Sequence, residues 1–468
     1  MTVQPARRIA LEVIIAVRES DAYANLLLPV RIGRAKLSPE DAGLATELTY
    51  GTLRMQGYYD RIIAMAAARS VEAIDPAVLD VLRLACHQLL SMRVAQHAAV
   101  DESVELAKTV GSRSAVGFVN AVLRTITRTD ASDWRRRVLA EAQTGEEALA
   151  LGYSHPLWIV RAFRQVLTAE GREAELEDLL TADNVAPRVS ITALPGLSAP
   201  QDLDAHPAAY SPVGAVLDGG DPLKLSAVRE GRARVQDEGS QLAALALSRA
   251  RPVVAGERWL DVCAGPGGKA ALLAAEALAG GAVLVANELV PARAELVRKA
   301  LAVFEHPPEV WEDDGTTIGE KFPELFDRIL LDAPCTGLGA LRRRPEARWR
   351  KQPSDVAGLG TLQARLLSSA LKALKPGGVL AYVTCSPHAA ETKSIVASVL
   401  RKVDDVERID TPAVIQSISM EPLDLPTASH AQLWPHRHNT DAMFIQLLGK
   451  AAGQPPGAEI GFLDVRAN

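Results

Sequence analysis

The sequence predicts a multidomain protein: an all-α N-terminal bundle, a small α+β module and a C-terminal α/β domain with a doubly wound parallel sheet. Three observations predict this order. Residues 1–130 place apolar side chains at helical spacing, without period-two alternation. Residues 150–235 are rich in proline, glycine and short β-prone stretches. From about residue 236, apolar strands alternate with amphipathic helices, which is typical of a parallel sheet covered on both faces.

The composition is that of a globular protein. Of 468 residues, 48% are apolar and 23% are charged, which excludes disorder of the whole chain. The formal charge of −6 excludes a polycation that coats nucleic acid by charge alone. Four cysteines cannot form the disulfide framework of a small secreted domain, so we expect a cytoplasmic protein.

Membrane insertion is not predicted. The sequence has no run of the roughly 18 uncharged apolar residues that a membrane helix requires. The N-terminal stretch MTVQPARRIALEVIIAV resembles a secretion signal, because two arginines precede apolar residues. However, Glu12 interrupts it and no small-residue cleavage site follows, so we expect an amphipathic helix there.

The N-terminal bundle carries clear helix signals. Ser38-Pro39 and Asp75-Pro76 each combine a capping side chain with an early proline. The periodic apolar stretches lie at 9–17, 44–53, 58–67, 78–90, 100–110 and 117–126.

The bundle is also the more basic part of the chain. Residues 1–140 contain 18 Lys and Arg against 15 Asp and Glu, a net charge of +3, which leaves −9 for the remainder. Arg124, Arg128 and the triplet Arg135–Arg137 are concentrated near its end. Such a run is either a solvated helix face or a contact with RNA phosphates, and the sequence leaves both open.

The cysteines divide into two kinds. Cys86 lies in an apolar helical run, as expected for a buried small hydrophobic residue. Cys263, Cys335 and Cys385 each follow a predicted strand of the C-terminal domain. Reactive groups of an open α/β sheet lie at these carboxyl ends of strands.

The motif DVCAGPGGKA, residues 261–270, joins a predicted strand to a helix. Gly265, Gly267 and Gly268 allow a tight turn and a close backbone approach to a ligand. Glu288 follows Gly268 by 20 residues at the end of the next strand, where a carboxylate can accept both hydroxyls of a ribose. The spacing is neither GxGxxG nor GxxxxGK[ST], so a dinucleotide or triphosphate is not indicated. S-adenosylmethionine, which has a ribose and no phosphate, fits; a purely structural turn is the alternative.

Two further motifs end strands that should share an edge with this loop. They are Asp332-Ala333-Pro334-Cys335 and Thr384-Cys385-Ser386. Two thiols and a carboxylate facing one crevice indicate covalent catalysis, in which a thiolate adds to carbon 6 of cytosine and makes carbon 5 nucleophilic. A helix N-terminus or a basic neighbour would be needed to lower the pKa of that thiol. A chance pair of buried thiols is the alternative.

Together these motifs resemble a known family. DVCAGPGGKA, DAPC and VTCS, in this order and spacing, are similar to the Nop/Sun class of RNA cytosine-5 methyltransferases, which has a Rossmann-like catalytic domain. VQDEGSQ (235–241), LRRRPEARWR (341–350) and LWPHRHNTDAMFIQLL (433–448) match as well, and the N-terminus resembles the NusB-type RNA-binding fold. The whole chain therefore resembles the bacterial Sun-type (Fmu) enzymes that methylate 16S rRNA.

The resemblance implies roles for individual residues. Cys385 matches the nucleophile, and Cys335 matches the residue that assists breakdown of the covalent adduct. Glu288 would bind the ribose and Asp314 would lie beside the adenine, although the adjacent Asp313 leaves that assignment open by one residue. Asp332 would lie near both the methionine end of the cofactor and the target base. The cofactor loop would comprise Cys263, Ala264, Gly265, Pro266, Gly267, Gly268 and Lys269.

Two positions depart from the family pattern. Gly265 replaces a usual alanine, and Ala270 stands where Thr or Ser is common. Both residues are small, so we expect cofactor binding to survive.

Several charged residues outside these motifs allow two interpretations. Lys269 is either a surface lysine at a helix start or a cation placed near Asp332. His436 and His438 lack a third ligand nearby, so we expect no metal site. The loop with Trp349 carries either solvated charge or cations that contact RNA, the latter being Arg342, Arg343, Arg344 and Arg348.

The sequence thus predicts a monomeric, S-adenosylmethionine-dependent enzyme that methylates carbon 5 of a cytosine in RNA, with 16S rRNA as its substrate. The alternatives are a DNA cytosine-5 methyltransferase and an RNA-binding or antitermination factor with an inactive transferase domain. The expected domains are 1–140 (RNA-binding helices), 150–235 (connecting module), 236–450 (catalytic domain) and 451–468 (tail).

Overall fold

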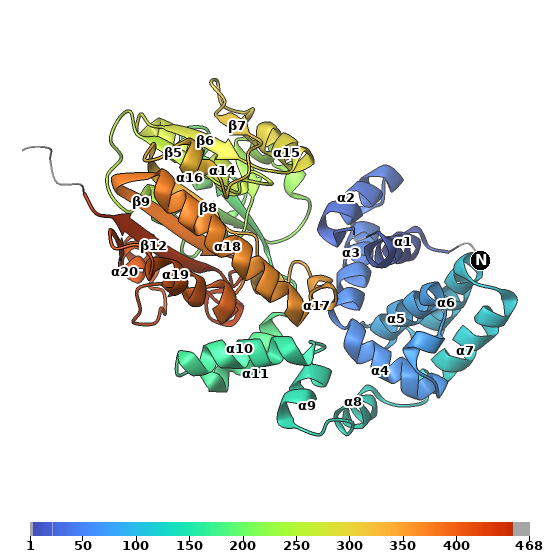
Figure 1. The fold of residues 1–468 in the computed structure, drawn as a ribbon. Coiled ribbons are helices and arrows are strands. Elements are labelled where there is room, and N and C mark those ends of the chain that lie inside the picture. Colours follow the sequence, from blue (N-terminus) through green and yellow to red (C-terminus); the bar gives the residue numbers. More distant parts are fainter. Residues whose placement is uncertain (1–2, 21, 453–468) are drawn as a thin grey trace, which may run out of the picture.

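The computed structural model describes residues 3–20 and 22–452. It consists of an N-terminal helical part and a C-terminal part built around a large sheet, with four helices between them (Figure 1). Within these described ranges, no helix is long and apolar enough to cross a membrane. The expected tail, 451–468, lies outside the described residues from position 453 onward.

The N-terminal part is a helical bundle, as predicted. Ser38 and Asp75 cap their helices as expected, since the Ser38 hydroxyl accepts from Asp41 N–H and the Asp75 carboxylate accepts from Ala77 N–H. Cys86 is fully buried, which confirms its prediction. The bundle helices are α1 (Pro5–Glu19), α2 (Ala24–Ala35), α3 (Pro39–Arg54), α4 (Gln56–Ala67), α5 (Pro76–Leu90), α6 (Gln96–Val110) and α7 (Arg113–Thr127).

Four helices and a small sheet connect the two parts. The helices are α8 (Ala131–Leu139), α9 (Gly145–Gly152), α10 (Leu157–Ala169) and α11 (Leu176–Ala182). Apolar side chains of α10 and α11 share a core with Leu338, Leu341 and Trp434 of the C-terminal part. The sheet is antiparallel, in the order β2-β3-β1-β4, with strands β1 (Val189–Ala193), β2 (His206–Pro207), β3 (Gly214–Leu217) and β4 (Ala233–Val235).

The C-terminal part is a sheet with the main order β10-β12-β9-β8-β5-β6-β7, and β11 pairs with β12 beside it. Its strands are β5 (Arg258–Asp261), β6 (Val283–Asn287), β7 (Glu309–Trp311), β8 (Phe326–Asp332), β9 (Leu374–Thr384), β10 (Val406–Arg408), β11 (Ala431–Gln432) and β12 (Phe444–Lys450).

Helices cover both faces of this sheet, as a doubly wound fold requires. One core contains side chains of α13 (Glu238–Ser248), α14 (Gly268–Ala279), α15 (Pro291–Leu301) and α20 (Thr411–Ile418). The core on the other face contains side chains of α16 (Ile318–Lys321), α18 (Pro353–Ala373) and α19 (Lys393–Leu400).

The predicted parallel, doubly wound sheet is present, but one strand, β12, runs antiparallel to the others. β5, β6, β7, β8 and β9 pair in parallel, but β12 runs antiparallel to both β9 and β10. The chain turns back through α21 (Pro435–His438) after β11, so β12 first forms an antiparallel pair with β11. Without a crossover helix between these strands, a parallel arrangement is not available.

The order of the strands decides where chemistry can occur. β5, β8 and β9 are neighbours in the centre of the sheet, and all three run in the same direction. Their carboxyl ends therefore lie at one edge, where the chain reverses direction across the sheet between β8 and β5.

Candidate active site

The glycine loop connects β5 to α14 as predicted. Ala264 N–H donates to the Asn287 carbonyl (2.8 Å), which ties the loop to the end of β6. Gly267 has φ +104°, and a Cβ atom there would lie 2.6 Å from the Ala300 side chain, so only glycine fits. The backbone of the loop is therefore fixed in shape, and it leads into the N-terminus of α14 with its N–H groups.

Glu288 directly follows β6 and is 4% exposed. Its carboxylate accepts the N–H groups of Gly265 (3.1 Å) and Val290 (3.0 Å) and pairs with Arg293 (3.3 Å). A Cβ atom on residue 265 would lie 2.3 Å from this carboxylate, which gives a local reason for glycine in place of the family's alanine. Oε1 keeps acceptor capacity for a ligand hydroxyl, and Oε2 would gain it when the exposed Arg293 moves away.

The loop surroundings fit a polar ligand of nucleoside type. Gln236 is 7% exposed, and neither its side-chain nitrogen nor its oxygen has a hydrogen-bond partner. Its amide nitrogen lies 3.7 Å from where a Cβ of Gly268 would stand. Buried polar groups are normally paired, so an unpaired amide beside a glycine loop indicates that a ligand supplies the partner.

The acidic pair after β7 is held in different ways. The Asp314 carboxylate accepts the N–H (2.9 Å) and hydroxyl (2.8 Å) of Thr316, which lowers the pKa of Asp314. The Asp313 carboxylate pairs with Lys321 (2.6 Å). The Asn287 side chain also exchanges two hydrogen bonds with the backbone of Asp313, so this segment is fixed beside the end of β6.

The two strand-end cysteines meet. The Sγ atoms of Cys335 and Cys385 are 3.4 Å apart, although 50 residues separate them. The hydrogen bond from Cys335 is the largest cause that lowers the pKa of Cys385, and the charges of Arg344 and Lys269 act in the same direction. That hydrogen bond, together with burial, raises the pKa of Cys335. The contact thus favours the thiolate form of Cys385 over that of Cys335.

A lysine and two carboxylates lie beside the thiols. Lys269 Nζ donates to Asp332 Oδ2 (2.8 Å) and to Ser240 Oγ (3.3 Å). Burial opposes the lysine charge, but Asp332 outweighs it, so the pKa of Lys269 is raised and the side chain stays cationic. Asp261 is buried at the end of β5; burial and the nearby Asp332 raise its pKa to about 8. Lys269 thus pairs with Asp332, which is the second of the two interpretations that the sequence left open.

Two family models and several known proteins are similar to this chain. The family model for the 16S rRNA methyltransferase RsmB/F matches residues 251–449, and that for the NusB family matches residues 4–128. The putative methyltransferase Rv1407 of Mycobacterium tuberculosis is 47% identical over 95% of this chain and 96% of its own length. The probable ribosomal RNA small subunit methyltransferase B of Synechocystis is 31% identical over 95% of this chain and 99% of its own.

The chain belongs to the RsmB/F family of 16S rRNA methyltransferases. The resemblance stated from the motifs, and the NusB-like assignment of the helical N-terminus, are thereby confirmed. Among solved structures, PH0851 superposes with a TM-score of 0.79 at 22% identity, covering 96% of this chain and 100% of that one. NSun6 from Pyrococcus horikoshii, solved with SFG, has a TM-score of 0.51 at 17% identity, covering 62% of this chain and 98% of that one.

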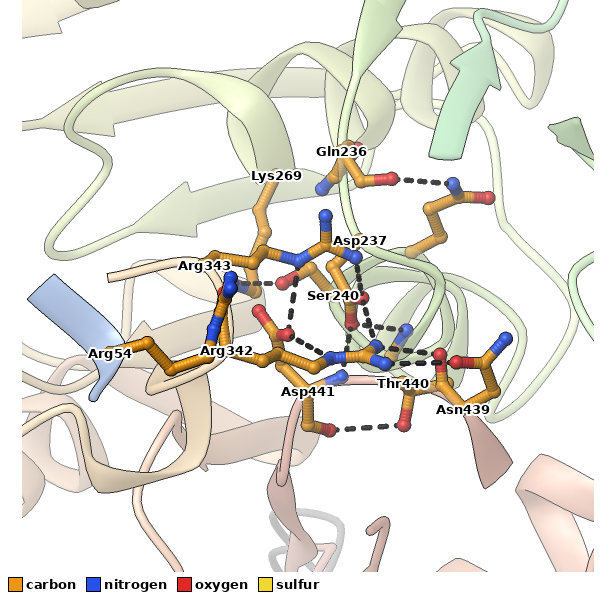
Figure 2. A network of polar contacts seen from close by, with 12 residues as sticks. Arg54, Gln236, Asp237, Ser240, Lys269, Arg342, Arg343, Asn439, Thr440 and Asp441 are labelled. Atoms are coloured by element: carbon orange, nitrogen blue, oxygen red, sulfur yellow. Dashed lines mark hydrogen bonds and ion pairs between the residues drawn. The ribbon is translucent and has the colours of Figure 1, made fainter. Parts of the chain in front are cut away.

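In this RsmB/F-family chain, the arginine-rich loop has mostly structural contacts. Arg342 is 3% exposed and Arg343 is half-buried; both pair with Asp441 and Asp237, at distances from 2.6 to 3.5 Å. Figure 2 shows this acid–arginine cluster beside Gln236, Ser240 and Lys269. The cluster ties Asp237, the N-cap of α13, to the arginine-rich loop and to Asp441, and Ser240 in the first turn of that helix accepts from Lys269.

Arg348 is fully buried where the two parts of the chain meet. Its guanidinium donates to the carbonyls of Arg54 (3.1 Å), Ser154 (3.2 Å) and Asp183 (2.9 Å) and to the Asn184 side chain (2.8 Å). The expectation that Arg342 and Arg348 contact RNA therefore needs correction, because both guanidinium groups are buried and bonded within the protein. Arg344 is exposed and lies over the Tyr23 ring, 5.7 Å from its centre.

The histidines that suggested a metal have protein partners. His436 bonds Glu175 (2.9 Å), and His438 bonds Trp434 N–H (2.9 Å) and the Asp424 carbonyl (3.1 Å). No group of three His, Cys, Asp or Glu side chains within residues 3–20 and 22–452 could hold a metal ion.

Two positions beside the site were not singled out as site residues from the sequence, namely Gln236 and Ser240. Both lie in VQDEGSQ, which is quoted above only as a matching stretch. The match of this stretch to the family was the available signal, but no spacing rule connects the stretch to the glycine loop 25 residues further along the chain.

Proposed function

We propose that this protein transfers a methyl group from S-adenosylmethionine to carbon 5 of a cytosine in 16S rRNA through a covalent Cys385–cytosine adduct. The observation that carries the proposal is the pair of thiols 3.4 Å apart beside the Lys269–Asp332 pair. Two cysteines in contact at strand ends suit a reaction that first needs a nucleophile and then a group that assists its release.

Glu288, Gln236 and the loop from Cys263 to Lys269 would hold the cofactor. The Glu288 carboxylate would accept the ribose hydroxyls, and the unpaired Gln236 amide would gain a partner. Asp314, or Asp313 beside it, would lie near the adenine. When bound, S-adenosylmethionine supplies an electrophilic methyl group.

The protein residues would act in sequence. The Cys385 thiolate adds to carbon 6 of cytosine, forming a C–S bond and placing electron density on carbon 5, which then accepts the methyl group. Cys335, after losing its own proton to solvent, would accept the carbon-5 proton; the electrons of that C–H bond would restore the ring double bond as the C–S bond breaks and Cys385 leaves as a thiolate. Asp332, held by Lys269, would orient the base.

RNA would contact the exposed basic residues of the NusB-like part and of the catalytic loop. Arg124, Arg128 and Arg136 are exposed at the end of the bundle, and Arg344 is exposed beside Tyr23. Guanidinium groups bind phosphates, and an exposed aromatic ring can stack on a base. Arg343 is half-buried and would contribute mainly through the acid–arginine cluster.

Bisulfite sequencing of ribosomal RNA from cells with and without this gene tests the proposal. We expect one 5-methylcytosine in 16S rRNA to disappear, and purified protein with S-adenosylmethionine to restore it. Methyl transfer to duplex DNA instead, or binding of RNA without transfer, would contradict the proposal in favour of the DNA-methylating or the inactive alternative.

A further inference from the structure

A buried carboxylate joins the two cysteine loops. Glu391, at the end of the short 3-10 helix Ala389–Glu391, is fully buried. Its Oε1 accepts the Thr336 N–H (2.7 Å), and its Oε2 accepts the Ser386 hydroxyl (2.6 Å) and the Thr336 hydroxyl (2.5 Å). Thr336 follows Cys335 and Ser386 follows Cys385, so one carboxylate holds the residue after each thiol.

The carboxylate is held by hydrogen bonds alone. Within the described part of the chain, Glu391 has no ion pair, and its fourth contact is the Gln363 amide (3.4 Å). Burying a carboxylate without a cation is costly unless its oxygens are well bonded. Here the bonds come from the cysteine loops and from Gln363, which also donates to the Pro334 carbonyl (2.8 Å).

Apart from the thiol contact itself, two backbone hydrogen bonds and one pair of hydroxyls also link the two loops. Gly339 N–H donates to the Cys385 carbonyl, and Ala333 N–H donates to the Val383 carbonyl, both at 2.9 Å. These bonds fix the chain path but leave the direction of the thiols free. The Thr336 and Ser386 hydroxyls are also 3.1 Å from each other, so Glu391 and these hydroxyls form a closed set directly behind the cysteines.

We propose that Glu391 is a positioning residue for the two-thiol reaction: it holds the loops so that Cys335 and Cys385 stay in contact. This inference rests on the proposed function, in which one thiol attacks and the other assists release. Without Glu391 the loops separate, Cys385 loses its hydrogen-bond donor, and both steps slow while the cofactor loop is unaffected.

The test compares Glu391→Ala and Glu391→Gln with Glu257→Gln. Glu257 is a buried carboxylate at the opposite end of β5, bonded to Arg328 (2.8 Å), and so serves as a matched control for the loss of a buried charge. We expect Glu391→Ala to lower kcat about 100-fold, as a misplacement near 1 Å typically does. The cofactor Kd should stay within about twofold. Glu391→Gln should recover most of the rate, because its oxygen still accepts and its amide can donate to the hydroxyls.

A second measurement needs no RNA. Diamide oxidises two neighbouring thiols to a disulfide and is itself reduced to the hydrazine; peptide mass spectrometry then reports the Cys335–Cys385 bond. Because disulfide formation requires close thiols, wild type, Glu391→Gln and Glu257→Gln should be trapped readily and Glu391→Ala about tenfold more slowly.

The outcomes separate the two proposals. A folded Glu391→Ala protein with wild-type kcat and trapping overturns the positioning role. If wild type is trapped and Glu391→Ala is not, but no RNA is methylated by wild type, the positioning role stands and the proposed function fails. Should Glu391→Ala not fold, Ser386→Ala replaces it, since it removes one hydrogen bond on the Cys385 side; unchanged kcat and trapping there also overturn the inference.

Discussion

Replacing Glu288 with alanine should weaken cofactor binding by a calculable amount. The carboxylate is nearly fully buried at the end of β6 and already accepts two backbone N–H groups, one on each oxygen. The proposed addition is a pair of ribose hydroxyls, one on Oε1 and one that would replace Arg293 on Oε2. Hydrogen bonds to a charged group contribute about 1.5–3 kcal/mol. A loss of that size corresponds to a rise in the cofactor Kd of about 10- to 150-fold.

Isothermal titration calorimetry with S-adenosylmethionine measures this change. Glu312→Ala is the control, because Glu312 follows the adjacent strand β7 and its carboxylate is exposed and paired with Arg298. The S-adenosylmethionine Kd of Glu312→Ala should stay near the wild-type value. The thermal unfolding curve of Glu288→Ala must remain cooperative for the comparison to hold. If the folded variant binds with the wild-type Kd, the ribose acid lies elsewhere and the assignment of Glu288 is refuted.

Three further predictions address the thiols, the junction and the buried acid. Cys385→Ala should form neither methylated RNA nor an adduct, whereas Cys335→Ala should remain bonded to RNA as a slow, RNase-sensitive band on a denaturing gel; the reverse pattern would exchange their roles. Arg348→Ala should lower the free energy of unfolding in urea by about 3 kcal/mol, against about 0.5 kcal/mol or less for the exposed Arg344→Ala, and equal losses would contradict the junction role. The pKa of Asp261 is about 8 in the folded protein against an ordinary 3.8, so its contribution to stability is full below pH 4 and is lost as pH rises toward 8. Asp261→Asn should therefore remove this decline when the free energy of unfolding is measured from pH 4 to pH 8. If the free energy of unfolding of the variant falls with pH as steeply as that of wild type, the prediction is refuted.

Local sequence patterns were sufficient to predict the features that depend on a few neighbouring residues. The helix caps at Ser38 and Asp75, the glycine loop after β5 and the strand ends at Cys335 and Cys385 were all predictable. Parallel strands end at one edge, so both cysteines were expected there; the contact between the thiols also requires that β8 and β9 are neighbours, which the structure shows. The antiparallel β12 was not predictable, because its apolar run suits either direction.

The family, the order of the elements and the residues that reach the sheet edge were all predictable from the sequence, because these depend on residue type and spacing along the chain. Which charged side chains are exposed depends on how the chain folds, and could not be predicted from spacing. Arg344 and Arg348 lie four residues apart in one loop, yet Arg344 is exposed and Arg348 is enclosed by carbonyls from three distant segments. The roles proposed for Gln236 and Glu391 likewise depend on neighbours that are far away in the sequence. The partners of a polar or charged side chain are the groups that lie around it, and the fold brings those groups together.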